Sequence, residues 1–182
     1  MNLTEYASYD GLGLADLVRA GQVSAAELGQ LMLSAVERVN PQINAVLETY
    51  PERIAALERG ARPGGAFAGV PFLLKDIGAS EAGKPQEMGA RLARGRLAPA
   101  DSFLTGLFRT AGLSILGRTA TPEFALSAST ESLLTGATRN PWDLRLSAGG
   151  SSGGQCGGRD RGNRPRQRRC RLDPHSGQPT IP

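Results

Sequence analysis

The sequence predicts an α/β fold, in which a mixed sheet is covered by helices. Three observations predict it. Leucine and valine recur at helical spacing in the first 40 residues, short aliphatic runs at 70–76 and 113–116 read as strands, and helical and strand-like segments alternate along the chain. Hydrophobic residues make up 40% of the 182-residue chain, which is typical of one globular domain with its own core.

The N-terminal elements follow from helix signals. Residues 10–20 carry leucines and a valine on one helical side, with Gly21 as a stop. Ser24 and Glu27 have the spacing of a capping box, and apolar residues follow at helical spacing. We expect Asn40-Pro41 to end that helix, because a residue before proline avoids the helical region. A short strand at 43–47 and a helix at 52–59 are expected next.

The middle of the chain alternates between strand and helix. The apolar run 70–76 predicts a strand that ends in two charged residues, and the mixed composition of 77–96 predicts a long loop with some helix. We expect Asp101 to cap a helix that stops near Gly112, and 113–116 to form a buried strand. The Gly-, Ser- and Asn-rich segment 135–154 indicates an ordered functional loop rather than a linker.

Charge divides the chain at residue 154. The whole chain has a formal charge of +4, but residues 155–182 hold seven arginines and two aspartates, or +5, which leaves −1 for residues 1–154. Residues 155–182 also contain both cysteines and the single histidine, and they show no apolar periodicity. We therefore expect residues 1–154 to form the structured portion and residues 155–182 to be an Arg-rich disordered tail.

These distributions exclude several classes of function for residues 1–154. Without Cys or His, this part cannot hold a disulfide framework, a Cys/His zinc site or a Ser–His catalytic pair. The sequence has no apolar run of about 18 residues and no signal-peptide pattern at its N-terminus. We expect a cytoplasmic protein with no membrane partner.

The first candidate site is a loop with two adjacent serines between glycines: Gly149, Gly150, Ser151, Ser152, Gly153 and Gly154. Such glycines let the backbone approach a substrate closely while the serines supply hydroxyls. Two other interpretations stay open: a flexible Gly/Ser linker, and a nucleophile elbow of the G-x-S-x-G type, which needs an acid and a histidine further along the chain. A phosphate loop is disfavoured because the G-K-[ST] ending is missing.

Lys75 is the second candidate, at the end of an apolar run. Burial there disfavours the charged form and lowers the pKa of the amine, so that a neutral lysine can act as a general base. The alternative is a strand-end lysine whose amine reaches into water, with Asp76 as a surface charge or a helix cap.

Four segments in order resemble a known family. Residues 69–76 resemble the pattern G-[VI]-P-x-x-x-K-D, residues 117–124 resemble G-K-T-N-x-x-E-F, and residues 136–143 resemble G-x-x-x-N-P-[WY]-[ND]; Ser151 and its glycines complete the match. These are motifs of the amidase-signature enzymes. The residues that fill them here favour the 6-aminohexanoate-cyclic-dimer hydrolase type within that family. The resemblance covers most of residues 10–154, the N-terminal part of that fold.

The resemblance implies hydrolysis of a carbon–nitrogen amide bond in a small molecule by a Ser–Ser–Lys triad, without metal or cofactor. Lys75 would be the base and Ser151 the bridging serine, while Ser152, Gly149, Gly150, Gly153 and Gly154 would shape the loop. The nucleophilic serine of the family lies about two dozen residues further on, in a G-G-S segment that residues 155–182 lack. We therefore expect a chain truncated before its nucleophile, and inactive.

Residues 155–182 allow two interpretations. A one-base shift of a suitable choice of codons turns 155–160 into a small-residue run like that of the family, so an out-of-frame reading explains the arginines, the cysteines and the lost periodicity together. The alternative is a non-catalytic remnant with an Arg-rich arm that binds nucleic acid. The arm has no aromatic residues on which bases could stack, so we do not expect nucleic acid as a partner.

Overall fold

The computed structural model describes residues 1–60, 64–155, 171–172 and 179–180. Its centre is a three-stranded sheet of β1 (Val46–Thr49), β2 (Pro71–Lys75) and β3 (Ser114–Thr119). The order is β1-β3-β2, with β3 antiparallel to β1 and parallel to β2. The sheet is therefore mixed, as the sequence predicts.

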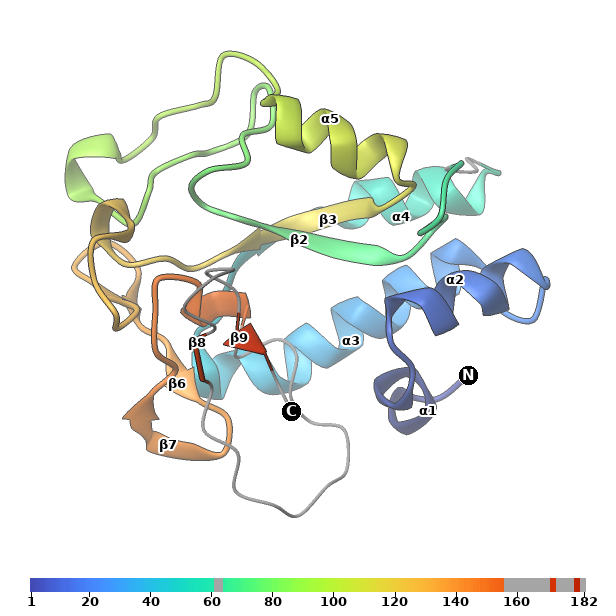
Figure 1. The fold of residues 1–182 in the computed structure, drawn as a ribbon, viewed down its shortest axis with the longest axis horizontal. Helices are drawn as coiled ribbons and strands as arrows, with labels where there is room; N and C mark the ends of the chain where they lie inside the picture. The colour runs from blue at the N-terminus through green and yellow to red at the C-terminus, as the bar shows by residue number, and fades with distance from the viewer. Residues whose placement is uncertain (61–63, 156–170, 173–178, 181–182) are drawn as a thin grey trace.

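Helices lie on both faces of this sheet (Figure 1). The helices are α1 (Leu3–Ser8), α2 (Gly11–Arg19), α3 (Ala25–Ile43), α4 (Pro51–Glu58) and α5 (Phe103–Thr110). The long helix α3 runs along one face, where Met32 and Leu116 share an apolar cluster with Ile54 of α4. On the other face α5 packs onto β2 through Phe108 and Phe72, whose ring centroids are 4.8 Å apart.

Side chains cap both α2 and α3, and the capping box of α3 is the one that the sequence predicts. Asp10 caps α2 by accepting a hydrogen bond from the N–H of Gly13. Ser24 and Glu27 form a capping box at the start of α3, in which each side chain accepts from the other residue's N–H. Both contacts satisfy N–H groups that a helix start leaves without partners.

The predicted end of α3 at Asn40-Pro41 is wrong, because the helix continues to Ile43. Pro41 removes one N–H donor, but it lies only two residues before that end, in the last turn of the helix. Asn44 then ends the helix in the left-handed conformation, with φ of 50°. The Asn40 side chain accepts from the N–H groups of Ala45 and Val46 and donates to the Val46 carbonyl. The strand expected at 43–47 consequently starts at Val46.

Two further boundaries differ from the prediction. The cap of α5 is Ser102, whose hydroxyl accepts from the N–H of Thr105, and not Asp101. Asp101 instead accepts from the N–H of Ala82 and pairs with Arg109. Strand β3 extends to Thr119 instead of ending at residue 116, and all six of its residues are buried.

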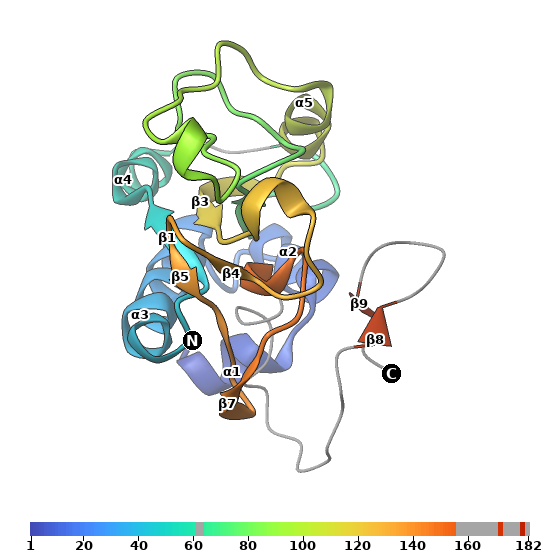
Figure 2. The same ribbon diagram turned by 90° about the vertical axis from the view of Figure 1, so that its left-hand side faces the viewer.

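The segments between these elements match the prediction more closely. Residues 77–102 form a loop with one short helical turn, η1 (Arg91–Ala93). Beyond β3 come the turn η2 (Glu123–Ala125) and the antiparallel pairs β4 (Glu131–Ser132) with β5 (Gly136–Ala137), and β6 (Arg139–Asn140) with β7 (Asp143–Ser147). The segment 135–154 is thus ordered, and Figure 2 shows it beside α3 and β1.

Within the predicted tail, the structure describes Gln155 and the antiparallel two-residue strands β8 (Arg171–Leu172) and β9 (Pro179–Thr180). The remaining residues from 156 onward lie outside the described residues. The disorder that the sequence predicts for 155–182 therefore stays a prediction for them, and the short β8–β9 pair is a feature it did not anticipate.

Candidate active site

Lys75 and Ser151 are in direct contact. The Nζ atom of Lys75 donates a hydrogen bond of 2.7 Å to the Oγ atom of Ser151. Lys75 is the last residue of β2, and Ser151 lies in the glycine–serine loop after β7. The fold therefore brings together the two residues that separate sequence motifs single out.

The environment of Lys75 makes the charged form of its amine less stable than it is in water. The side chain is half-buried, and this desolvation lowers the pKa of the amine below the usual 10.5. This is the direction that the sequence predicts. The amine contacts Ser151 rather than only reaching into water, so the alternative of a plain strand-end lysine does not describe it.

Two buried threonines hold the loop that carries Ser151. Thr121 donates from its hydroxyl to the Ser151 carbonyl at 3.2 Å. Thr130 donates to the Gly149 carbonyl at 2.9 Å, and its hydroxyl accepts from the N–H of Gly153 at 3.1 Å. Both threonines are fully buried, so the backbone on either side of Ser151 is bonded to groups that cannot move freely. The Gly150–Ser151 peptide bond is cis.

Glycine is required in this loop for close packing. A Cβ atom on Gly153 would lie 2.3 Å from the Thr130 hydroxyl oxygen, and one on Gly154 would lie 2.5 Å from the Ala120 nitrogen. Neither distance is tolerable for a real side chain. The flexible-linker interpretation is therefore wrong for these residues. Ser152 accepts the N–H of Gln155 at its carbonyl, at the start of a helical turn.

The histidine that a nucleophile elbow would need, His175, lies outside the described residues. Across residues 1–60 and 64–155 and the two short C-terminal strands, no cluster of three or more His, Cys, Asp or Glu side chains could hold a metal ion. No helix in those same stretches is both long and apolar enough to cross a membrane.

A buried ion-pair network beside Lys75 was not anticipated from the sequence. Asp76 is 2% exposed, pairs with Arg118 at 2.7 Å, and accepts from the N–H groups of Glu87 and Gly89. It is neither a surface charge nor a helix cap. Burial raises the pKa of Asp76, while Arg118 and the two N–H groups act in the opposite direction. The available signal was Arg118, a charged residue directly after the buried strand that the sequence predicts at 113–116.

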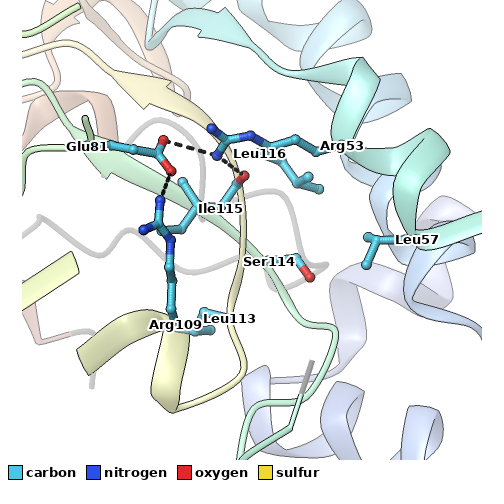
Figure 3. Close-up of a pocket in the computed structure, with 8 residues that line it drawn as sticks. All are labelled: Arg53, Leu57, Glu81, Arg109, Leu113, Ser114, Ile115 and Leu116. Carbon is cyan, nitrogen blue, oxygen red and sulfur yellow. Dashed lines mark hydrogen bonds and ion pairs between the residues drawn. The ribbon is translucent and has the colours of Figure 1, made fainter. Parts of the chain in front are cut away.

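A separate pocket of about 390 Å³ lies between α4, α5 and β3 (Figure 3). Glu81 pairs there with Arg53 at 3.0 Å and with Arg109, and leucine and isoleucine side chains form the walls. Neither Lys75 nor Ser151 lines it. This pocket is therefore distinct from the Lys–Ser pair.

The structure thus places a lysine of lowered pKa in hydrogen-bond contact with a serine of a closely packed glycine loop, at the end of a mixed sheet. The amidase family model matches residues 27–156, and the chain belongs to this family. The resemblance seen in the sequence motifs is thereby confirmed.

The relatives agree with the family assignment. The chain is 40% identical over 147 residues to a 6-aminohexanoate-cyclic-dimer hydrolase from Paenarthrobacter ureafaciens, and the match covers 80% of this chain and 29% of that enzyme. A second 6-aminohexanoate-cyclic-dimer hydrolase, from a Pseudomonas species, is also 40% identical over 147 residues, with the same coverage of 80% and 29%. The chain thus spans less than a third of the length of these curated relatives.

Solved structures show the same fold. The structure of a 6-aminohexanoate cyclic dimer hydrolase matches with a TM-score of 0.76 and 38% identity, over 85% of this chain and 31% of that one. A bacterial aryl acylamidase of the amidase-signature family matches with a TM-score of 0.70 and 30% identity, over 80% and 32%. The α/β architecture with a mixed sheet is therefore that of the amidase-signature enzymes.

Proposed function

We propose that residues 1–154 are the part of an amidase that supplies the base and the bridging serine for hydrolysis of a carbon–nitrogen amide bond. The observation that carries this proposal is the 2.7 Å contact between Lys75 and Ser151. A chain of proton transfer needs its groups within hydrogen-bond reach, and this pair meets that requirement.

In a protein that also contains the family's G-G-S segment, the proposed proton path runs from the serine of that segment through Ser151 to Lys75. Neutral Lys75 accepts the Ser151 proton at Nζ, while Ser151 takes the proton of the attacking hydroxyl. In the reverse direction the lysine returns the proton, through Ser151, to the leaving nitrogen. Burial supports this role, because a lysine of lowered pKa is neutral in a larger fraction of molecules.

The proposed substrate is a small-molecule amide. Cyclic amides are the first class to test, since two of the relatives are named for hydrolysis of a cyclic dimer of 6-aminohexanoate. We propose a cytoplasmic setting, no membrane partner and no nucleic-acid partner. We also propose that residues 155–182 are an out-of-frame reading and that the chain as it stands is inactive, because its sequence contains no G-G-S segment after Ser151.

The test compares this chain with a protein in which the reading frame is corrected just after Gly154. We expect no turnover of aryl or cyclic amides by the present chain, and turnover by the longer protein. In the longer protein Lys75→Ala should lower the rate by several powers of ten, roughly 10² to 10⁴ or more, since it removes the base. Asp16→Asn, at an exposed ion pair with Arg19, is the matched control and should leave the rate unchanged.

Two results would overturn the proposal. Turnover by the present chain that vanishes with Ser151→Ala would show that no further serine is needed. A longer protein that is active and indifferent to Lys75→Ala would remove the lysine from the mechanism.

A further inference from the structure

Arg118 joins three segments around the end of β2. Its guanidinium contacts Asp76 at 2.7 Å, Glu87 at 3.0 Å and Glu48 at 3.3 Å, and its side chain is 10% exposed. These carboxylates come from the residue after β2, from the loop that follows, and from β1. A planar guanidinium with five donors can serve several carboxylates at once.

Asp76, the partner of Arg118, also fixes the end of β2 through three hydrogen bonds of its own. Its carboxylate accepts from Glu87 at 3.0 Å and from Gly89 at 3.2 Å, and its own N–H donates to the Thr119 carbonyl at 3.1 Å. Asp76 therefore ties the residue next to Lys75 both to β3 and to the loop at 87–89.

The strand that carries Arg118 also leads to the loop of Ser151. Two residues beyond β3, Thr121 donates to the Ser151 carbonyl, and Ala120 accepts at its carbonyl from the N–H of Gly154 at 3.3 Å. Lys75 and Ser151 are thus attached to the same short stretch of chain, 118–121, one through Asp76 and the other through Thr121.

Arg118 does this without touching Lys75. Neighbouring residues of a strand point to opposite faces of the sheet, and in the parallel register Arg118 is paired with Leu74 and Thr119 with Lys75. Asp76 and Arg118 accordingly lie on the face opposite to the Lys75 amine. Besides its direct electrostatic effect, the ion pair can influence the amine through the backbone and through the access of water to it.

We propose that the Arg118–Asp76 ion pair is a positioning device that holds the Lys75 amine, partly dehydrated, against Ser151. This rests on the proposed function, in which Lys75 is the base. Breaking the pair lets the end of β2 move away from the Ser151 loop, so that water reaches the amine and the Lys75–Ser151 contact is lost.

The test uses the present chain, which contains two lysines, Lys75 and Lys84. In protein labelled with ¹³C at lysine Cε, the two resonances titrate separately in NMR spectra, and Lys84→Gln assigns them by removing one. The variant is Asp76→Asn, and the control is Asp101→Asn, at an ion pair with Arg109 on α5.

The sign of the shift separates positioning from simple electrostatics. Loss of the negative charge of Asp76, with Arg118, Glu48 and Glu87 still present, would by itself lower the Lys75 pKa. Loss of positioning rehydrates the amine and raises the Lys75 pKa toward that of an ordinary lysine. We expect the rise in Asp76→Asn and no change in Asp101→Asn. A fall, or no shift, in Asp76→Asn overturns the proposal.

A second variant covers the case in which Asp76→Asn does not fold. Arg118→Lys keeps the positive charge but cannot contact three carboxylates at once, so it should raise the Lys75 pKa by less than full rehydration would. The third lysine resonance, which this variant adds, is identified by comparison with the parent spectrum. An unchanged Lys75 pKa in a folded Arg118→Lys protein also overturns the proposal. These titrations report the placement of Lys75, whereas turnover of the frame-corrected protein reports its role as base, so the two hypotheses fail separately.

Discussion

The Lys75 Nζ and Ser151 Oγ atoms are 2.7 Å apart, although 76 residues separate them in the chain. The contact depends on β3, which pairs with β2 over its whole length and continues into the residues that bind the Ser151 loop. Each of the two side chains can be recognised from its local sequence, but only the pairing of β2 with β3 brings them together.

Removing the Thr130 hydroxyl should loosen the Ser151 loop. Thr130→Val leaves the Gly149 carbonyl with one partner fewer and the Gly153 N–H with none in the described structure, and we expect a loss of about 1–3 kcal/mol in unfolding free energy. Urea denaturation measures it. Thr110→Val, on an exposed face of α5, is the matched control and should change stability by less than about 0.5 kcal/mol. Equal effects at both positions would contradict this account.

Adding one carbon at Gly153 should be destabilising. The Cβ of Gly153→Ala would meet the Thr130 side chain at 2.3 Å, and that side chain is fully buried. We expect a loss of about 1–3 kcal/mol, the usual range for overpacking. Gly106→Ala is the comparison, because nothing lies within 4 Å of its Cβ and α5 is helical there. It should be stabilising by about 1 kcal/mol. A Gly153→Ala protein as stable as the parent would refute the packing argument.

Stability should depend on pH through Lys75. Its pKa is lowered in the folded state, so between that value and the unfolded value of 10.5 the unfolded chain binds more protons. The unfolding free energy therefore rises with pH across this window. Below the folded pKa, the cost of burying the charged Lys75 amine is fully present. We expect denaturation curves of the parent and of Lys75→Met to diverge in favour of the parent as pH rises toward about 10. Parallel pH profiles would argue against a desolvated lysine.

The capping box of α3 should contribute measurably to the stability of the protein. Ser24→Ala removes the acceptor for the Glu27 N–H, and we expect a loss of about 1 kcal/mol. Thermal denaturation followed by circular dichroism would show it as a lower midpoint. Ser24→Asp retains an acceptor and should keep most of the stability; a Ser24→Asp protein as weak as Ser24→Ala would point to another cause.

Features set by neighbouring residues were predictable from the sequence, and features set by distant ones were not. Ser24 and Glu27 are three residues apart, and their capping box could be predicted from spacing alone. Asp101 and Ser102 are both good caps, and the choice between them depends on Ala82 and Arg109, which local sequence does not show.

The candidate site divides in the same way. Lys75 and Ser151 each stand in a recognisable sequence pattern, so both could be proposed as site residues from the sequence alone. The Asp76–Arg118 pair spans 42 residues and is formed only when β2 and β3 align, so its burial could not be anticipated. Asn40-Pro41 failed as a helix end because the contacts of Asn40 with Ala45 and Val46 favour a later turn.

The tight packing of Gly153 and Gly154 has a practical consequence for finding such sites. A Gly-Gly-Ser-Ser-Gly-Gly stretch has the composition of a flexible linker. Here Gly153 and Gly154 allow close packing and do not make the loop flexible, because Thr130 and Ala120 occupy the space that a side chain would need. An assignment by composition alone would therefore treat as a spacer the segment whose serine contacts Lys75.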